Sequence, residues 1–347
     1  MSDLRIAIVG AGIIGHTHAA TLADVRGVAL SAVVDPIAGA DVAERHGVPL
    51  FTDVGALLDA GVADAAIVAS PNDTHVPITS ALLRAGLPVL LEKPVANSVA
   101  DGEALIAVAE ETGVPVLVGH HRRHNPIIKA AKAAITAGRL GDLVTATVNS
   151  TLAKPSSYFD VAWRRGSASG GPLSINLIHE IDLLRHFWGE VAEVRAFASN
   201  HHRGFDVEDT AAAILVFASG GIATLTISDA ATGPWAWDVT AGENPARFPA
   251  HDTIAHAYAG TLAALSLPDL AFWRPADEPD WTVRMTRGTL PCTPADPYIG
   301  QIEHFAAVAR GNASPLVSLA DGVANMRVIE AIKTSAANGA PAQPMRL

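Results

Sequence analysis

The chain has 347 residues, of which 49% are hydrophobic and 17% are charged, and it contains 29 glycines and 22 prolines. This length exceeds what one ordinary hydrophobic core supports and predicts two domains, while the composition excludes a coiled coil and a disordered polymer. The formal net charge of −11 opposes binding to nucleic acid and to anionic membranes.

Residues 1–120 alternate short aliphatic runs with segments of helix length, which is the pattern of a parallel β-sheet with crossover helices. The strands are predicted over 6–9, 29–34, 65–69, 89–91 and 114–118, and the helices near Ile13, Ile37, Val54, Thr74 and Ser98. Right-handed crossovers make this a doubly wound Rossmann sheet that binds its ligand beyond the carboxyl ends of the strands.

The pattern changes after about residue 125, where strands follow one another with few helices between them. Strands are predicted over 143–150, 191–198, 211–217 and 222–228, and helices over 126–137, 171–188, 298–310 and 319–337. This order predicts an antiparallel sheet. Residues 235–293, rich in Pro, Trp and Asp, allow no assignment.

The longest uncharged stretch, residues 210–228, is long enough to raise the question of a membrane span. Its centre is Ser219-Gly220-Gly221, and its second half alternates threonines with aliphatic residues, so we predict a two-stranded hairpin instead. The only cysteine, Cys292, cannot form an internal disulfide, and the N-terminus does not resemble a secretory signal. We therefore expect a cytoplasmic protein that has no membrane partner.

A glycine-rich segment at residues 10–15 follows the first predicted strand and opens a helix. In such a motif the first glycine permits a tight turn, the second lets the backbone approach a pyrophosphate, and the third allows close packing of helix on strand. The helix N-terminus adds unpaired N–H groups and a positive dipole end. We expect a dinucleotide to be bound here by Gly10, Gly12, Ile13, Ile14 and Gly15.

Polar residues follow the next strands at the same edge of the sheet. Asp35 ends the second strand, where its carboxylate can accept hydrogen bonds from the ribose hydroxyls and would repel a 2′-phosphate, so we expect NAD rather than NADP. The alternative is that Asp35 only caps the helix that follows it. Ser70 and Asn72 lie in a loop after the third strand, within reach of a cofactor ribose.

Together these residues resemble the Gfo/Idh/MocA oxidoreductase family, over nearly the whole chain. The resemblance rests on the glycine motif, a Ser-Pro-Asn-x-x-His loop, a Glu-Lys-Pro motif, a Gly-Gly-to-His segment and an Asp-Pro-Tyr helix start, at residues 10–15, 70–75, 92–94, 170–179 and 296–298. It implies a Rossmann NAD-binding domain over 1–122. It also implies a substrate-binding and oligomerisation α/β domain over 123–347, with a large open, mainly antiparallel sheet and the last helix packing back on the first domain. A homodimer or homotetramer is expected.

By this resemblance Lys93 is the catalytic lysine, which forms a hydrogen bond with the substrate hydroxyl on the carbon from which the hydride leaves. A buried ammonium there would stabilise developing alkoxide character. His179 is the matching residue of the second domain and our candidate general acid or base, and Asn176 can share its helix face to orient substrate. Many family members carry an Asp four residues before this His, where this chain has Ile175. Either His179 works with Lys93 alone, or Asp182 supplies the orienting carboxylate.

Further residues are assigned to the site. We expect cofactor contacts from His75, Glu92, Lys93, Arg122, Trp163 and Arg164, and substrate contacts from Arg165 and Tyr298 in addition to Lys93, Asn176 and His179. A solvated turn is an equal alternative for Arg122, and core packing is an equal alternative for Tyr298. A His120–His124 metal pair would fall on a turn without a Cys or carboxylate ligand, so no metal is expected.

The sequence thus predicts an NAD-dependent dehydrogenase that reversibly oxidises a secondary alcohol of a sugar, polyol, cyclitol or cyclic diol. A redox-neutral enzyme that uses NAD transiently, such as an epimerase or an eliminating glycosidase, is the alternative. A non-enzymatic NAD-responsive regulator would keep the glycine motif but would not need Lys93 and His179 together. The substrate is not encoded in any transferable motif.

Overall fold

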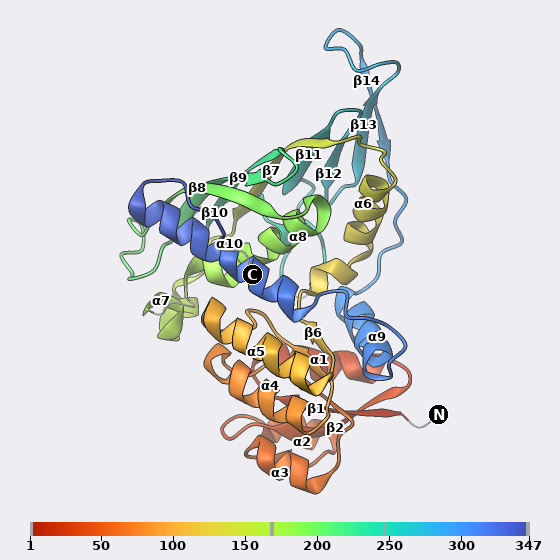
Figure 1. Ribbon diagram of the computed structural model, residues 1–347, viewed down its shortest axis with the longest axis vertical. Coiled ribbons are helices and arrows are strands. Elements are labelled where there is room, and N and C mark those ends of the chain that lie inside the picture. Colours follow the sequence, from red (N-terminus) through yellow and green to blue (C-terminus); the bar gives the residue numbers. More distant parts are fainter. Residues whose placement is uncertain (1–2, 167–169, 246, 345–347) are drawn as a thin grey trace. The chain divides into compact units, whose positions relative to one another are not determined.

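The computed structural model describes residues 3–166, 170–245 and 247–344 (Figure 1). The chain forms two compact units. Unit 1 contains the residues up to His124 together with Ala295–Val323, and unit 2 contains Asn125–Pro294 together with the residues from Ala324 onward. The domain limits of 1–122 and 123–347, and the roles given to each domain, stay predictions.

Unit 1 is built on a six-stranded parallel sheet in the order β3-β2-β1-β4-β5-β6. The strands are β1 Leu4–Val9, β2 Val28–Val34, β3 Leu50–Phe51, β4 Ala65–Val68, β5 Val89–Leu91 and β6 Val116–Val118. Residues of β4 and β5 are fully buried, as in sheets covered on both faces. The doubly wound parallel sheet predicted from the sequence is therefore confirmed.

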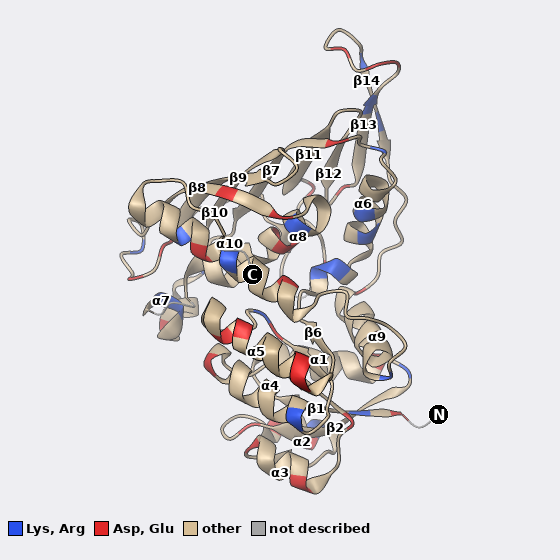
Figure 2. Ribbon diagram, viewed as in Figure 1, with Lys and Arg blue, Asp and Glu red and all other residues tan. Residues whose placement is uncertain are grey.

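Two helices of unit 1, α3 and α5, begin at residues whose side chains cap a backbone N–H group of the first turn. Asp53 and Ser98 cap α3 and α5 by accepting hydrogen bonds from Ala56 N and Asp101 N. The helices are α1 Ile13–Asp24, α2 Ala40–His46, α3 Val54–Ala60, α4 His75–Arg84, α5 Val99–Thr112 and α9 Pro297–Ala309, with 3₁₀ turns η1 Asn72–Thr74 and η2 His121–His124. The sequence of α5 has four acidic and no basic residues, so this helix presents negative charge (Figure 2).

Unit 2 is built on an eight-stranded sheet in the order β14-β13-β12-β11-β7-β10-β9-β8, in which only the β7–β10 pair is parallel. The strands are β7 Leu143–Thr151, β8 Val191–Ser199, β9 Thr210–Phe217, β10 Ile222–Ser228, β11 His256–Gly260, β12 Ala264–Leu267, β13 Ala271–Pro275 and β14 Met285–Thr289. The mainly antiparallel sheet and the β9–β10 hairpin are confirmed. Within the described part of the chain, no helix combines the length and apolar character needed to cross a bilayer.

Three helices of unit 2 pack on one face of this sheet (Figure 1). They are α6 Pro126–Thr136, α8 Ile178–Trp188 and the part of α10 Leu319–Asn338 that lies in unit 2. Unit 2 also contains α7 Trp163–Gly166 and the short turns η3 Ser156–Asp160 and η5 Trp237–Val239. A π-helical segment, η4 Leu173–Leu177, leads directly into α8. Buried polar contacts hold α8 to α10, because Asn325 donates to Asp182 and accepts from Arg185.

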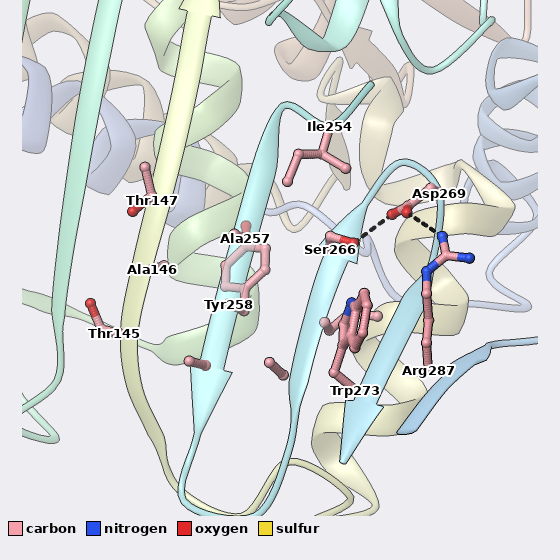
Figure 3. A pocket seen from close by; sticks show the side chains of 13 residues that line it. Thr145, Ala146, Thr147, Ile254, Ala257, Tyr258, Ser266, Asp269, Trp273 and Arg287 are labelled. Carbon is pink, nitrogen blue, oxygen red and sulfur yellow. Dashed lines mark hydrogen bonds and ion pairs between the residues drawn. The ribbon is translucent and has the colours of Figure 1, made fainter. Parts of the chain in front are cut away.

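The opposite face of the eight-stranded sheet carries a hollow of about 420 Å³ (Figure 3). Cross-strand neighbours Thr145, Ala259, Ala264, Trp273 and Arg287 form one row along it, so small residues in the middle make the depression. None of the site residues predicted from the sequence lines this hollow. It is a feature of the sheet surface rather than of the predicted active site.

Candidate functional site

The glycine turn between β1 and α1 has the shape that a pyrophosphate requires. Gly10 has a φ of 97°, and a Cβ there would lie 2.6 Å from the backbone of Ser70. A Cβ on Gly15 would overlap the carbonyl oxygen of Gly10, whereas a Cβ on Gly12 would meet no atom within 4 Å. Gly12 also begins α1 without a side-chain cap, so the first N–H groups of the helix are left for an anion.

Asp35, at the end of β2, is held in place by the backbone. Its carboxylate accepts hydrogen bonds from Ala11 N, Ile37 N and Ala38 N at 2.7–2.8 Å. Partial burial by itself would raise the pKa of Asp35, but the bonds from Ala11, Ala38 and Ile37 outweigh this effect and lower the pKa. The carboxylate is thus kept ionised beside the glycine turn, and its bonds to Ile37 and Ala38 explain why α2 begins at Ala40 rather than near Ile37.

His75 joins the two loops that follow β4 and β5. Its ring nitrogens lie 2.9 Å from the carbonyl oxygen of Ser70 and 2.8 Å from that of Pro94, and the residue is buried. Burial lowers its pKa. Ser70 Oγ lies 2.6 Å from Thr74 Oγ1, while Asn72 is half-buried at the start of η1. In this position His75 supports the backbone of both loops, and a direct contact with the cofactor stays a prediction.

Glu92, directly before Lys93, is buried against a histidine that the sequence analysis did not assign. His18 Nε2 on α1 lies 2.8 Å from Glu92 Oε1, and the side chains are 0% and 10% exposed. Burial would raise the pKa of Glu92, but the hydrogen bond and charge of His18 and the charge of Lys93 lower it. The carboxylate fits because residue 119 is glycine, where a Cβ would lie 2.8–2.9 Å from it.

Tyr298, the third residue of the Asp-Pro-Tyr motif, belongs to the same side-chain cluster of unit 1. Asp296 caps α9 by accepting a hydrogen bond from Tyr298 N. The phenol ring stacks on His121 at 4.5 Å and meets His18 edge to face at 5.8 Å. Tyr298, His121, His18 and Glu92 therefore form a continuous group, and Glu92 accepts a hydrogen bond from the backbone N–H of Lys93. The substrate contact of Tyr298 stays a prediction.

Arg122 and Arg123 are both buried in unit 1. Arg123 donates a hydrogen bond to the carbonyl oxygen of Leu316 and pairs with Asp321 at 3.7 Å. Arg123 is thus buried in contact with the segment before α10 and with the first turn of α10, rather than lying on a solvated turn. Its neighbour Arg122 is buried as well, and its contact with the cofactor stays a prediction.

In unit 2, the segment 173–179 holds two of the predicted substrate residues. His179 is buried in the first turn of α8, and Asn176 is half-buried in the π-helical turn before it. Asn176 Oδ1 lies 2.7 Å from Nζ of Lys154, a residue that the sequence analysis did not single out. Asp182 lies in the buried contact with Asn325, so its part in orienting His179 stays a prediction.

A second buried pair lies beside His179. Glu180 Oε2 is 2.8 Å from His256 Nε2, although the two groups are not aligned as a regular hydrogen bond, and His256 Nδ1 lies 2.9 Å from the hydroxyl of Tyr258. Burial and the charge of Glu180 raise the pKa of Tyr258 well above its usual range. These contacts anchor the start of α8 to β11.

The Trp163-Arg164-Arg165 step forms α7 of unit 2. Arg164 stacks over the ring of Tyr158 at 4.1 Å and donates a hydrogen bond to the carbonyl oxygen of Tyr158. The side chain of Arg164, a predicted cofactor contact, is therefore held by a residue of unit 2. Trp163 and Arg165 are exposed. Across the described ranges, no group of three His, Cys, Asp or Glu side chains is arranged to hold a metal ion.

Comparisons with known proteins agree with this architecture. Residues 4–120 match the model of the oxidoreductase family with an NAD-binding Rossmann fold, and residues 128–244 match the GFO/IDH/MocA C-terminal domain. The chain belongs to the Gfo/Idh/MocA oxidoreductase family. It is 28% identical to the rhizopine catabolism protein MocA of Rhizobium meliloti, over 95% of this chain and 94% of that protein. It is also 28% identical to scyllo-inositol 2-dehydrogenase (NAD+) of Bacillus subtilis strain 168, over 98% of this chain and 96% of that protein.

A solved structure shares the whole fold of this family member. An oxidoreductase from Agrobacterium radiobacter, in complex with NAD+, L-tartaric acid and magnesium, superposes with a TM-score of 0.82 at 21% identity, covering 99% of this chain and 98% of that one. Together with the matched family models, this makes the chain an NAD(P)-dependent oxidoreductase with a Rossmann domain. The glycine turn and Asp35 fit the dinucleotide that the Rossmann domain implies.

Three polar residues of this Gfo/Idh/MocA protein were missed as site neighbours. His18 and Lys154 contact predicted site residues that are 74 and 22 positions away in the sequence. His121 lies between His120 and His124 and receives no role from the sequence, yet it stacks on Tyr298. Position along the chain gives no signal for such contacts. Only the helical spacing of Gly15, Ala19 and Leu22 in α1, which places His18 on the same buried side, hints at one of them.

Proposed function

We propose that the protein is an NAD-dependent dehydrogenase that oxidises a secondary alcohol of a sugar, polyol, cyclitol or cyclic diol, with Lys93 and His179 acting at the reacting carbon. The observation that carries this proposal is the placement of Lys93. It follows β5 in the NAD-binding unit, directly after a carboxylate that is buried and lies 2.8 Å from His18 Nε2. The relatives named inositol dehydrogenase support the alcohol class.

Each residue has a distinct task in this proposal. When bound, NAD+ supplies the acceptor for the hydride. Lys93 donates a hydrogen bond to the reacting oxygen and stabilises its developing negative charge, while the nearby Glu92 carboxylate favours the charged ammonium. His179 takes the hydroxyl proton as general base, and Asn176 orients the substrate. Tyr298, Arg165, Trp163, Arg164 and Arg122 complete the proposed cofactor and substrate contacts.

The test is NADH formation with a panel of sugars, polyols, cyclitols and cyclic diols. Lys93→Met should lower kcat at least about a hundredfold with any substrate found, as expected for loss of a group that acts on the proton or oxygen in the transition state. NADH affinity should stay within about twofold. Lys129→Met, on the exposed side of α6, is the matched control. Near-normal turnover by Lys93→Met would contradict the assignment, and product formed without net NADH would favour a redox-neutral enzyme.

We also propose that NAD is preferred over NADP, and that the protein is a homodimer or homotetramer. Asp35 supports the first proposal because its ionised carboxylate lies at the end of β2, where a 2′-phosphate would meet negative charge. The exposed apolar residues on the open face of the eight-stranded sheet, among them Ile214, Ile222 and Trp273, support the second.

A further inference from the structure

The π-helical segment before His179 is held by three charged side chains from other parts of unit 2. Glu208 accepts a hydrogen bond from Leu173 N at 2.9 Å, Lys333 donates to Ser174 Oγ at 2.8 Å, and Lys154 donates to Asn176 Oδ1 at 2.7 Å. Single turns of π-helix are rare and are frequently found at functional sites. Of the three contacts, only that of Lys154 ends on a predicted substrate residue.

Lys154 is itself firmly fixed. Its side chain is 8% exposed, lies 3.7 Å from the carboxylate of Asp229 and sits over the ring of Tyr158 at 4.6 Å. Its backbone N–H donates to the carbonyl oxygen of Asp229, and its own carbonyl oxygen accepts from Arg203. A lysine that is buried and restrained at both ends has one position for its amine, and in this position the amine contacts Asn176.

This contact decides which way the Asn176 amide faces. An ammonium group has donors and no acceptor, so the Asn176 atom 2.7 Å from Lys154 Nζ must be the oxygen. The amide nitrogen is then the end left for other contacts. Among the described residues Nδ2 of Asn176 has no hydrogen-bond partner, and the residue is half-buried rather than enclosed. Asn176 therefore presents a donor one helical turn before His179.

The same segment lacks a carboxylate, the group that would accept hydrogen bonds from substrate hydroxyls. Residues 174–179 read Ser-Ile-Asn-Leu-Ile-His and contain no carboxylate. A carboxylate at this place would accept hydrogen bonds from substrate hydroxyls and repel a substrate carboxylate. An amide that shows only its N–H groups favours an oxygen that accepts without donating, such as that of a carboxylate or a carbonyl.

We propose that Lys154 fixes Asn176 as a hydrogen-bond donor, and that the subsite beside His179 consequently takes a substrate carboxylate or carbonyl oxygen near the carbon that is oxidised. The substrate class narrows to hydroxy acids and hydroxy-carbonyl compounds, such as uronic acids. Lys154 is a positioning residue and specificity determinant, since it acts through Asn176. This inference rests on the proposed function, in which Asn176 and His179 face the substrate.

The experiment compares matched pairs that differ in one carboxylate. The dissociation constants of D-glucuronate and D-glucose, and of D-galacturonate and D-galactose, are measured by calorimetry on the NADH-loaded protein. The wild type should bind at least one acid about tenfold more tightly than its sugar, as expected for a hydrogen bond to a charged group. Lys154→Met, which leaves Asp229 paired with Arg203, should reduce this preference about tenfold because the amide can then turn over.

Two further variants separate this role from a purely structural one. Asn176→Asp keeps the shape of the side chain but replaces its N–H donors with a carboxylate oxygen, so this variant should bind the sugar more tightly than the acid. Lys129→Met is the control and should leave the preference for the acid unchanged. Both variants should bind NADH as the wild type does. Equal binding of acid and sugar, binding of neither, or a preference unmoved by Lys154→Met and Asn176→Asp would overturn the inference. Absence of NADH formation with every alcohol tested would instead overturn the proposed function, and the binding comparison would still stand.

Discussion

The buried pair of His18 and Glu92 gives the sharpest test of how the loop that carries Lys93 is supported. The perturbation is His18→Leu, which leaves the Glu92 carboxylate, 10% exposed, without its partner at 2.8 Å. Removing one member of a buried pair costs about 3–5 kcal/mol, because the remaining charge is no longer compensated. We expect the free energy of unfolding at pH 7 to fall by about 3 kcal/mol, the lower end of that range.

The assay is urea unfolding of four proteins: wild type, His18→Leu, Glu92→Gln and the double variant. The double variant contains no buried charge at this place, so its loss should be smaller than the sum of the single losses by about 2 kcal/mol. Strictly additive losses would refute the reasoning, because they would mean that the two side chains do not stabilise each other in the folded protein.

The pH dependence follows from the lowered pKa of Glu92. A carboxyl group whose pKa is lower in the folded than in the unfolded protein adds stability above its unfolded value of 4.5, and this stability is lost as the pH falls through the folded value. The wild type should therefore lose stability relative to Glu92→Gln when the pH is lowered below about 4.5. A constant difference across this range would show that Glu92 does not have a lowered pKa.

Other predictions concern the glycines, the cofactor and the sheet face. Gly119→Ala should lower the free energy of unfolding by about 1–3 kcal/mol in the same urea assay, since its Cβ would lie 2.8–2.9 Å from the carboxyl group of Glu92. Gly12→Ala should leave stability unchanged, because its Cβ meets nothing within 4 Å, but should weaken NADH binding in a fluorescence titration. Asp35→Asn should reduce the preference for NAD over NADP at least about tenfold, and an unchanged ratio would remove Asp35 from cofactor selection. Ile214→Asp, on the open sheet face, should lower the mass measured by light scattering, and an unchanged mass would place the subunit interface elsewhere.

Most of the fold could be predicted because its elements carry strong local patterns. The strand from Val89 to Leu91 is predicted with its exact bounds, and α3 begins at the predicted Val54. The strands β11 to β14 were missed because they are short and lack alternation. In β14 all five residues from Met285 to Thr289 are exposed, so no buried face marks it as a strand. The two-residue strand β3 is too short for any periodicity.

The candidate site was predictable only in part, for a physical reason. Motifs such as the glycine turn and Glu-Lys-Pro are local, since their chemistry depends on residues next to one another in the chain. The orientation of an amide or the charge state of a buried carboxylate depends on partners that only folding brings near. Lys154 determines which end of Asn176 is presented, and His18 keeps Glu92 ionised. Neither residue has a motif of its own.

The chain changes units three times, after His124, after Pro294 and after Val323. A fragment cut at the first of these points would lack α9, which supplies Tyr298 and its stacking contact with His121. A hybrid of two relatives should therefore take residues 295–323 from the same parent as its N-terminal segment, because both belong to unit 1. A hybrid joined at a single crossover near residue 124 would pack α9 from one parent in the same unit as the parallel sheet from the other parent.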